Sequence, residues 1–325
     1  FQLFNVSNPH WDYQIIIEQI NAVQNIKLYT ANGIWLNPIY TISQEYQNDV
    51  ISFYQAEVDN LDFTVADGSE AQINSWVENK TENRIPSVLQ PGALSGNTLL
   101  VLVNSIFFNG TWASPFKNAL TRKGDFYRPD GSSVQVDFMN QIHRYSLRKS
   151  YMDSDIIRIP FVNRRFALYI ALPKSEFALS TLEGEITGEN FSDEAFFHGY
   201  QDTFVNLTIP KFKLSSNMVL NNVLIDMGTS EAFSSAANFS GITREPAKMS
   251  YVIQKALIEV QESGTVAAAA TPIIMERTSA NSLPLNPYNF FANRSFVFFL
   301  REDRLQLILF QGKFADPKTK EINFP

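Results

Sequence analysis

Few side chains in this sequence could act as a nucleophile, a general base or a metal ligand. The chain has no cysteine, and its three histidines, His10, His143 and His198, lie far apart along the 325 residues. The lack of cysteine excludes disulfides, thiol catalysis and cysteine-ligated metals. A Ser-His-Asp triad or a zinc site would need one of the scattered histidines, and no supporting motif accompanies any of them. We therefore expect no enzyme, no metal site and no cofactor.

Charge and composition narrow the possible partners. The chain carries 26 Lys and Arg against 33 Asp and Glu, a net charge of −7. Nucleic acids and anionic membranes attract basic surfaces, so neither is expected as a partner. No apolar stretch approaches the length of a membrane-spanning helix. With 45% hydrophobic residues, the chain has enough apolar material for a sizeable core.

One low-complexity segment stands out, at residues 264–271 (GTVAAAAT). It follows a strand-like pattern and precedes a stretch rich in Ser, Asn and Pro, residues 272–294. Side chains as small as Ala and Thr could enter a narrow slot between existing strands. The alternative is an exposed loop without a role.

The elements that would position this segment follow from hydrophobic periodicity. Residues 11–23 and 70–77 have helical patterns, residues 26–36 alternate as a strand, and residues 99–108 are nearly continuously apolar, which is typical of a strand covered on both faces. Helices precede long strands, so we predict an α+β fold in a single domain, 1–325. Further strands are expected at 156–160, 166–173, 205–212, 257–261, 296–301 and 305–310, with a hairpin between the last two, and shorter helices at 179–184 and 217–227.

The segment around the alanines also carries a family resemblance. Residues 255–271 (KALIEVQESGTVAAAAT) resemble the hinge of the serpins, the loop-inserting serine protease inhibitors. Similar segments occur in the same order over nearly the whole chain, so the chain is identified as a member of that family. They are residues 73–85 (INSWVENKTENRI), 102–116 (LVNSIFFNGTWASPF), 210–214 (PKFKL), 237–242 (ANFSGI) and 296–317 (FVFFLREDRLQLILFQGKFADP).

The resemblance implies three β-sheets with surrounding helices and an exposed reactive-centre loop, with the hinge and loop at 262–294. A protease cleaves the loop and forms an acyl-enzyme, and the cleaved loop then enters the large sheet as a new strand and distorts the protease. Asn104 and Trp112 would lie where the sheet opens, and Lys255 would flank the hinge. Gly264 would be the pivot, and Thr265 the first residue to enter. The hinge residues implied in this way are Glu262, Gly264, Thr265, Ala267, Ala268, Ala269 and Ala270.

Two positions compete for the bond that the protease attacks. The register counted from Gly264 indicates Thr278-Ser279, whereas chemistry favours Arg277-Thr278, because a trypsin-like protease pairs an Asp in its specificity pocket with Arg. Arg277 is the only basic residue between Lys255 and Arg294. We therefore predict cleavage after Arg277 by a trypsin-like serine protease.

Some residues depart from the family pattern. Pro272 lacks the N–H that a central strand needs, which would slow insertion and let the protease finish hydrolysis. Gln254 stands where the family commonly has His. The main hypothesis is a suicide inhibitor, and the alternative is a non-inhibitory carrier, chaperone or storage protein that is cleaved as a plain substrate.

The remaining expectations concern processing and location. Relative to the family, the initial helices and the strand beneath the large sheet have no counterpart here, so we interpret the chain as a trimmed product. Residues 11–23 contain no basic residue, so heparin binding is not expected. We expect a secreted, extracellular, monomeric glycoprotein, and the candidate N-glycosylation sites are Asn5, Asn79, Asn109, Asn190, Asn206, Asn238 and Asn293.

Overall fold

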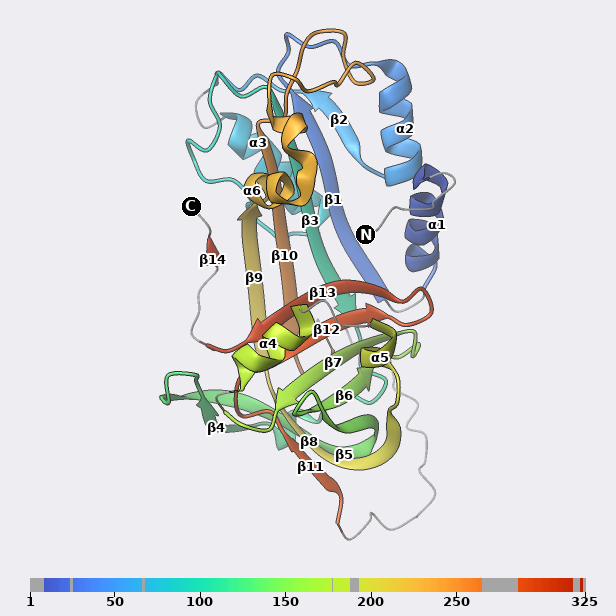
Figure 1. Cartoon of the computed structure of the whole chain (residues 1–325), viewed down its shortest axis with the longest axis vertical. Coiled ribbons are helices and arrows are strands. Elements are labelled where there is room, and N and C mark those ends of the chain that lie inside the picture. The colour runs from blue at the N-terminus through green and yellow to red at the C-terminus, as the bar shows by residue number, and fades with distance from the viewer. Residues whose placement is uncertain are drawn as a thin grey trace. The chain divides into compact units, whose positions relative to one another are not determined.

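The computed structural model describes residues 9–23, 26–65, 68–176, 178–187, 193–264, 286–317 and 322–323. The α+β architecture expected from the sequence is confirmed (Figure 1). By their internal contacts the residues form two compact units, each built from separate stretches of the chain. Unit 1 comprises 1–109, 214–258 and 320–325, and unit 2 comprises 110–213 and 259–319. The expectation of a single domain stays a prediction.

Six α-helices lie in the described ranges. They are α1 (Pro9–Asn21), α2 (Gln44–Tyr54), α3 (Gly68–Lys80), α4 (Leu179–Thr187), α5 (Asp193–Phe197) and α6 (Asn221–Leu224). Short helical turns also occur at Asn118–Leu120, Ile225–Thr229 and Ser230–Phe233. None of the helices in these ranges has the length and apolar character to cross a membrane.

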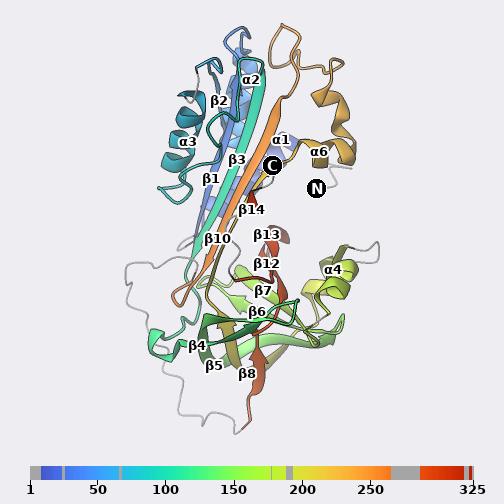
Figure 2. The same ribbon diagram turned by 90° about the vertical axis from the view of Figure 1, so that its left-hand side faces the viewer.

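Unit 1 is built around a six-stranded sheet in the order β14-β9-β10-β3-β1-β2. Its strands are β1 (Ile26–Leu36), β2 (Glu57–Asn60), β3 (Leu100–Gly110), β9 (Phe212–Val219), β10 (Tyr251–Val260) and β14 (Ile322–Asn323). Helix α3 packs on β1 (Figure 2) and buries Ile73 and Val77, while Val101, Val103 and Phe107 of β3 are fully buried. Neighbours β3 and β10 pair in parallel, with Gln254 opposite Asn104.

Unit 2 is built around an eight-stranded sheet in the order β11-β8-β5-β6-β7-β12-β13, with β4 also paired to β5. Its strands are β4 (Arg122–Tyr127), β5 (Ser133–Tyr151), β6 (Ser154–Pro160), β7 (Phe166–Pro173), β8 (Gln201–Pro210), β11 (Tyr288–Phe291), β12 (Phe296–Glu302) and β13 (Leu307–Phe314). The 19-residue strand β5 pairs with β4, β8 and β6 in turn. The three sheets that the resemblance implies correspond to the six-stranded sheet and to the eight-stranded sheet, in which the long strand β5 joins β4 and β8 to β6.

Most predicted elements form, and two differences have a clear cause. The helix expected at 217–227 begins later than predicted, because β9 continues to Val219; α6 (Asn221–Leu224) and the helical turn Ile225–Thr229 follow it. Strand β5 was not predicted, since its buried face changes within the strand. Val136 and Phe138 are buried on one side of that change, and Met139 and Tyr145 on the other, so no single alternation describes it.

Candidate functional site: the loop hinge

The chain folds back on itself immediately after β10. The backbone N–H of Gln261 donates to the Gly264 oxygen at 2.7 Å, and the Gly264 N–H donates to the Gln261 oxygen at 3.1 Å. These two bonds close a tight hairpin turn around Glu262 and Ser263. Gly264 also forms an antiparallel bridge with Thr111, the residue after β3. The first residue beyond the turn is thus already paired on both sides.

A residue with a side chain does not fit at position 264. Its φ of 142° is one that residues with a Cβ rarely adopt, and an added Cβ would lie 2.0 Å from the Gly110 oxygen and 2.8 Å from Thr111 Cα. Both obstacles are backbone atoms, so no side-chain rotation relieves them. Glycine is required at this point by both conformation and space.

Trp112 holds the turn from one side. Its indole is 1% exposed, its Nε1 donates to the Gln261 oxygen at 2.8 Å, and its backbone N–H donates to the Ser263 oxygen at 3.0 Å. The indole also stacks on Phe161 with ring centroids 4.4 Å apart. A large, rigid aromatic with a single donor is well suited to fix the backbone of a short turn.

The side chain of Glu262, which lies in the turn, is fixed by an ion pair and a hydrogen bond. The residue is 8% exposed, and its carboxylate accepts from Lys211 Nζ at 2.9 Å and from Thr121 Oγ1 at 2.8 Å. Burial alone would raise the pKa of this carboxyl group, but the bonds from Lys211 and Thr121 outweigh burial and lower it. Its backbone oxygen accepts from the Phe116 N–H at 2.9 Å. The charged form of Glu262 therefore anchors the turn within unit 2.

Asn104 belongs to a row of amide side chains across three strands of unit 1. Its Nδ2 donates to Asn32 Oδ1 on β1 at 2.6 Å, and its Oδ1 accepts from Gln254 Nε2 on β10 at 3.2 Å. The second bond crosses the β3–β10 pair, so separating these strands breaks it. Lys255 lies next to Gln254 rather than beside the turn, and its Nζ donates to the Ser87 oxygen at 2.8 Å.

Several predicted residues fall outside the described residues. They are Thr265, Ala267, Ala268, Ala269, Ala270, Pro272, Arg277, Thr278 and Ser279 of the loop, and Asn5 and Asn190 among the glycosylation candidates. Asn79 and Asn238 are exposed, whereas Asn109, Asn206 and Asn293 are half-buried. Asn206 is bonded to Asn140 and Asn289 through its amide, so a glycan there would displace both contacts.

Sequence reasoning missed the two side chains that pair with Glu262. Lys211 lies in the PKFKL segment, which was singled out only for its resemblance, and no local pattern marks Thr121. Their contact with Glu262 spans 51 and 141 residues respectively, so it appears only in the folded chain. Within the described ranges, no group of three or more His, Asp or Glu side chains could hold a metal ion.

Comparison with known proteins adds the family. The family model described as "Serpin (serine protease inhibitor)" matches residues 2–317. The chain belongs to the serpin family. An uncharacterized serpin-like protein of Methanosarcina acetivorans is 34% identical over 94% of this serpin and 72% of its own length. Human Antithrombin-III is 34% identical over 92% of this serpin and 64% of its own length.

The solved structures that resemble this serpin include a hormone-binding protein. Human thyroxine-binding globulin, solved in complex with thyroxine, matches with a TM-score of 0.84 and 27% identity, over 94% of this serpin and 80% of that chain. The family thus includes inhibitors, such as antithrombin, and a protein named for binding a hormone. Membership supports a protease as partner in general terms.

Proposed function

We propose that this serpin is a suicide-substrate inhibitor of a trypsin-like serine protease and acts as an extracellular monomer. The observation that carries the proposal is the hinge. Gly264 is already turned and paired with Gln261 on one side and Thr111 on the other. A strand that entered the sheet after cleavage would therefore start from a pair that is already made.

The sheet of unit 1 supplies the free energy for insertion. Strands β3 and β10 pair in parallel from Val101–Tyr251 to Phe107–Leu257. A strand that returns from the hairpin turn runs antiparallel to β10, and therefore to β3 as well. Insertion would replace one parallel ladder with two antiparallel ladders, which are somewhat more stable per residue. The closed sheet is in this sense the less stable of two arrangements.

The chemistry of trapping begins at Arg277. The protease serine attacks the Arg277 carbonyl carbon, the bond to the Thr278 nitrogen breaks, and the new amine leaves with the proton delivered by the protease histidine. An ester then links Arg277 to the serine. Water would complete hydrolysis unless insertion distorts the protease first.

The alternative remains a non-inhibitory serpin that is cleaved as a plain substrate. Pro272 is the residue that favours it, because a proline eight residues after Gly264 removes one donor from an inserting strand. The two functions share the fold and the cleavage and differ in whether insertion outruns hydrolysis.

One experiment separates them. The serpin is incubated with trypsin, and the products are boiled in SDS and separated on a gel. An inhibitor gives a covalent complex and a released peptide that begins at Thr278, whereas a substrate gives two fragments and no complex. A peptide beginning at Ser279 would contradict Arg277 as the attacked residue. The Arg277→Ala variant, which offers trypsin no basic side chain at this bond, is the control.

A further inference from the structure

A pocket in unit 2 lies among strands β4, β5, β8 and β11 and is closed at one side by Leu120. Its volume is about 340 Å³, within the range of about 300–1,000 Å³ that is usual for small-molecule sites. None of the hinge residues described above lines it.

The walls of this pocket are mainly apolar. Phe138 of β5 is 4% exposed, whereas Leu120 and Phe291 are 43% and 44% exposed and present apolar surface to solvent. The rings of Phe138 and Phe291 meet edge to face, with centroids 5.2 Å apart. Gly124 lies against the Phe138 ring, where a Cβ would be 3.0 Å from Cδ2, so a larger residue would crowd the ring. A flat aromatic group would find aromatic partners here.

Two polar side chains that line the pocket have unused bonding capacity. The Asn140 Nδ2 donates to Asn206 Oδ1 at 2.9 Å, to the Leu207 oxygen at 3.2 Å and to Thr208 Oγ1 at 2.8 Å. The Leu207 carbonyl can only accept, which fixes the orientation of the amide. No described residue donates to Asn140 Oδ1 or accepts the hydroxyl proton of Thr208. The pair therefore offers one acceptor and one donor, which an amide group complements.

The rim of the pocket is positively charged. Arg122 and Lys123 line it, together with no carboxylate of the part of the chain that the structure describes. Lys123 pairs with Asp137 at 3.3 Å, whereas the exposed Arg122 donates to the uncharged carbonyl groups of Ala119 and Thr121, at 2.6 and 2.8 Å.

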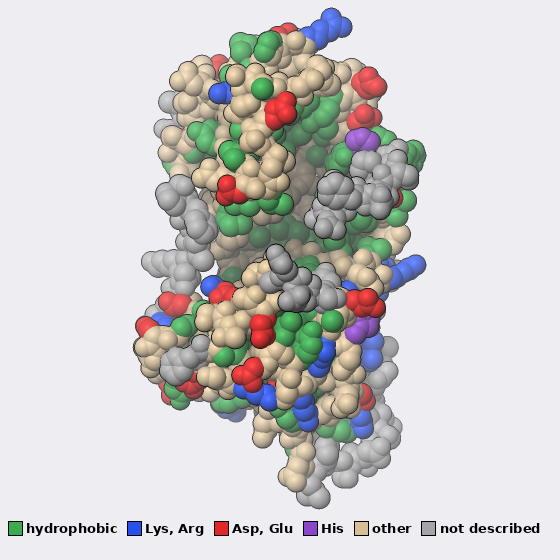
Figure 3. Space-filling model, in the orientation of Figure 1, with side chains coloured by type: hydrophobic (Ala, Val, Ile, Leu, Met, Phe, Trp, Pro, Cys, Tyr) green, Lys and Arg blue, Asp and Glu red, His purple; other side chains and the backbone are tan. Residues whose placement is uncertain are grey.

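The distribution of charge over the chain also favours an anion in unit 2. Most Lys and Arg residues belong to unit 2, whereas the Asp and Glu residues are divided almost evenly between the two units. Figure 3 shows several of these Lys and Arg side chains on the surface of unit 2. Such a surface attracts negatively charged ligands.

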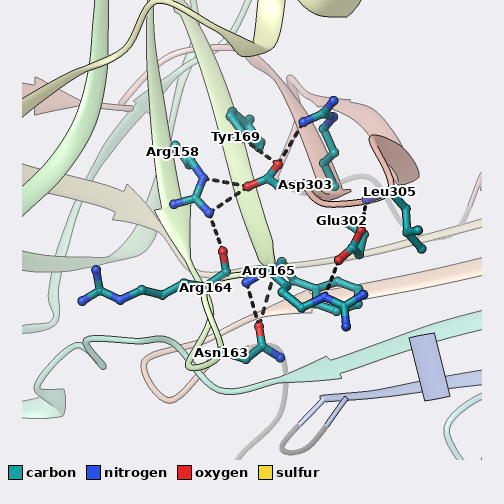
Figure 4. Close-up of polar contacts among 10 residues, drawn as sticks. Arg158, Asn163, Arg164, Arg165, Tyr169, Glu302, Asp303 and Leu305 are labelled. Carbon is teal, nitrogen blue, oxygen red and sulfur yellow. Dashed lines mark hydrogen bonds and ion pairs between the residues drawn. The ribbon is translucent and has the colours of Figure 1, made fainter. Parts of the chain in front are cut away.

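The arginines in Figure 4 differ from Arg122 in this respect. Arg158 lies 2.7 Å from a carboxylate oxygen of Asp303, and Arg165 lies 2.6 Å from one of Glu302. Their charges are neutralised within the protein, whereas the charge of Arg122 is free to attract a ligand.

We propose that the pocket among β4, β5, β8 and β11 binds an aromatic amino acid with an acylated nitrogen and a free carboxylate. The ring would pack against Phe138 and Phe291, the amide would bond to Asn140 and Thr208, and the carboxylate would lie near Arg122. The inference is independent of the reactive loop and holds for an inhibitor and a plain substrate alike.

The test is a fluorine NMR titration of the full chain with N-acetyl-5-fluoro-L-tryptophan. We expect saturable binding that N-acetyl-L-tryptophan displaces. N-acetyl-L-alanine, which lacks the ring, should displace the probe at least about tenfold less well. Indole-3-propionate, which lacks the amide, should be about 2–10-fold weaker, and the uncharged N-acetyl-L-tryptophanamide up to about fivefold weaker.

Two variants test the location. Phe291→Ala removes one aromatic wall and should weaken binding at least about threefold. Because Phe291 also contacts Phe138, Leu120→Asp is a second variant, which leaves the strands unchanged, puts a carboxylate beside that of the ligand and should weaken binding at least about fivefold. The matched controls are Tyr127→Ala and Val162→Asp, which change an exposed aromatic and an equally exposed aliphatic residue outside the pocket and should leave binding unchanged.

The proposal is overturned if the wild-type protein shows no saturable binding, or if Leu120→Asp and Val162→Asp bind the probe equally well. Equal displacement by N-acetyl-L-alanine and N-acetyl-L-tryptophan would contradict the aromatic part of the ligand. Acetyl-Ala-Ala-Trp carries the same group at the end of a peptide. Displacement equal to that by N-acetyl-L-tryptophan would support a peptide C-terminus as the source, and displacement at least about tenfold weaker would support a free N-acyl amino acid.

Discussion

At the scale of single residues, Gly264 is the position least tolerant of change. Gly264→Ala places a methyl group against the Gly110 and Thr111 backbone in a conformation unfavourable to alanine, so the turn must shift. We expect a loss of about 1–3 kcal/mol in stability, and more cleaved serpin per protease trapped. Stoichiometry of inhibition with trypsin measures the second effect. Gly241→Ala is the control, because nothing lies within 4 Å of its Cβ position. An equal stoichiometry of inhibition for the two variants would contradict a role of the Gly264 turn in inhibition.

Glu262 gives the hinge a dependence on pH. Its pKa is lowered in the folded state, so its contribution is present above the ordinary carboxyl pKa and is lost as pH falls through the lowered value. Glu262→Gln should therefore destabilise the protein at pH 7, by about 1–3 kcal/mol because Lys211 is one-third exposed, and have less effect in acid. Urea unfolding at pH 7 and at pH 3.5 measures the difference. Asp137→Asn, which breaks the exposed pair with Lys123, should change little at either pH.

At the scale of elements, we expect the Asn32–Asn104–Gln254 amide row to slow the separation of β3 and β10. Gln254→Ala leaves Asn104 Oδ1 without its donor and should cost about 1 kcal/mol. If the closed sheet is the less stable arrangement, the same change should speed the loss of inhibitory activity during incubation at 37 °C. Amides do not titrate, so this rate should be flat between pH 5 and 8. Gln44→Ala, an exposed glutamine of α2, is the control, and a rate equal to that of Gln254→Ala would remove any role for the row.

The elements also show how far sequence reasoning reaches. Strands β1 and β7 form at the predicted residues. Burial in β7 is continuous on both faces, and burial in β1 alternates from Ala31 to Trp35. Glu262, Gly264 and Trp112 were singled out through a resemblance, and the structure adds why each matters. Lys211 and Thr121 are brought to Glu262 by long-range pairing, which local periodicity does not encode.

At the scale of the whole molecule, cleavage should stabilise an inhibitor. Insertion of the cleaved loop replaces one row of backbone hydrogen bonds with two, and each kilocalorie per mole shifts the midpoint of a protein of 325 residues by about 1.5 °C. We expect the trypsin-cleaved protein to melt at least about 10 °C above the intact protein. Calorimetry of both forms measures it. An unchanged midpoint would indicate a plain substrate, and a Gly264→Ala sample cleaved in the same way should gain less.

The turn that is already closed at Gly264 bears on time as well as on stability. Forming a hairpin from an open chain takes about 1–10 μs. Here the first pair, between Gln261 and Gly264, is already formed, so insertion on the proposed function would extend an existing hairpin. Typical proteases turn over in milliseconds to a second. On the proposed function, the race with hydrolysis would be decided by how quickly the strand extends through Pro272.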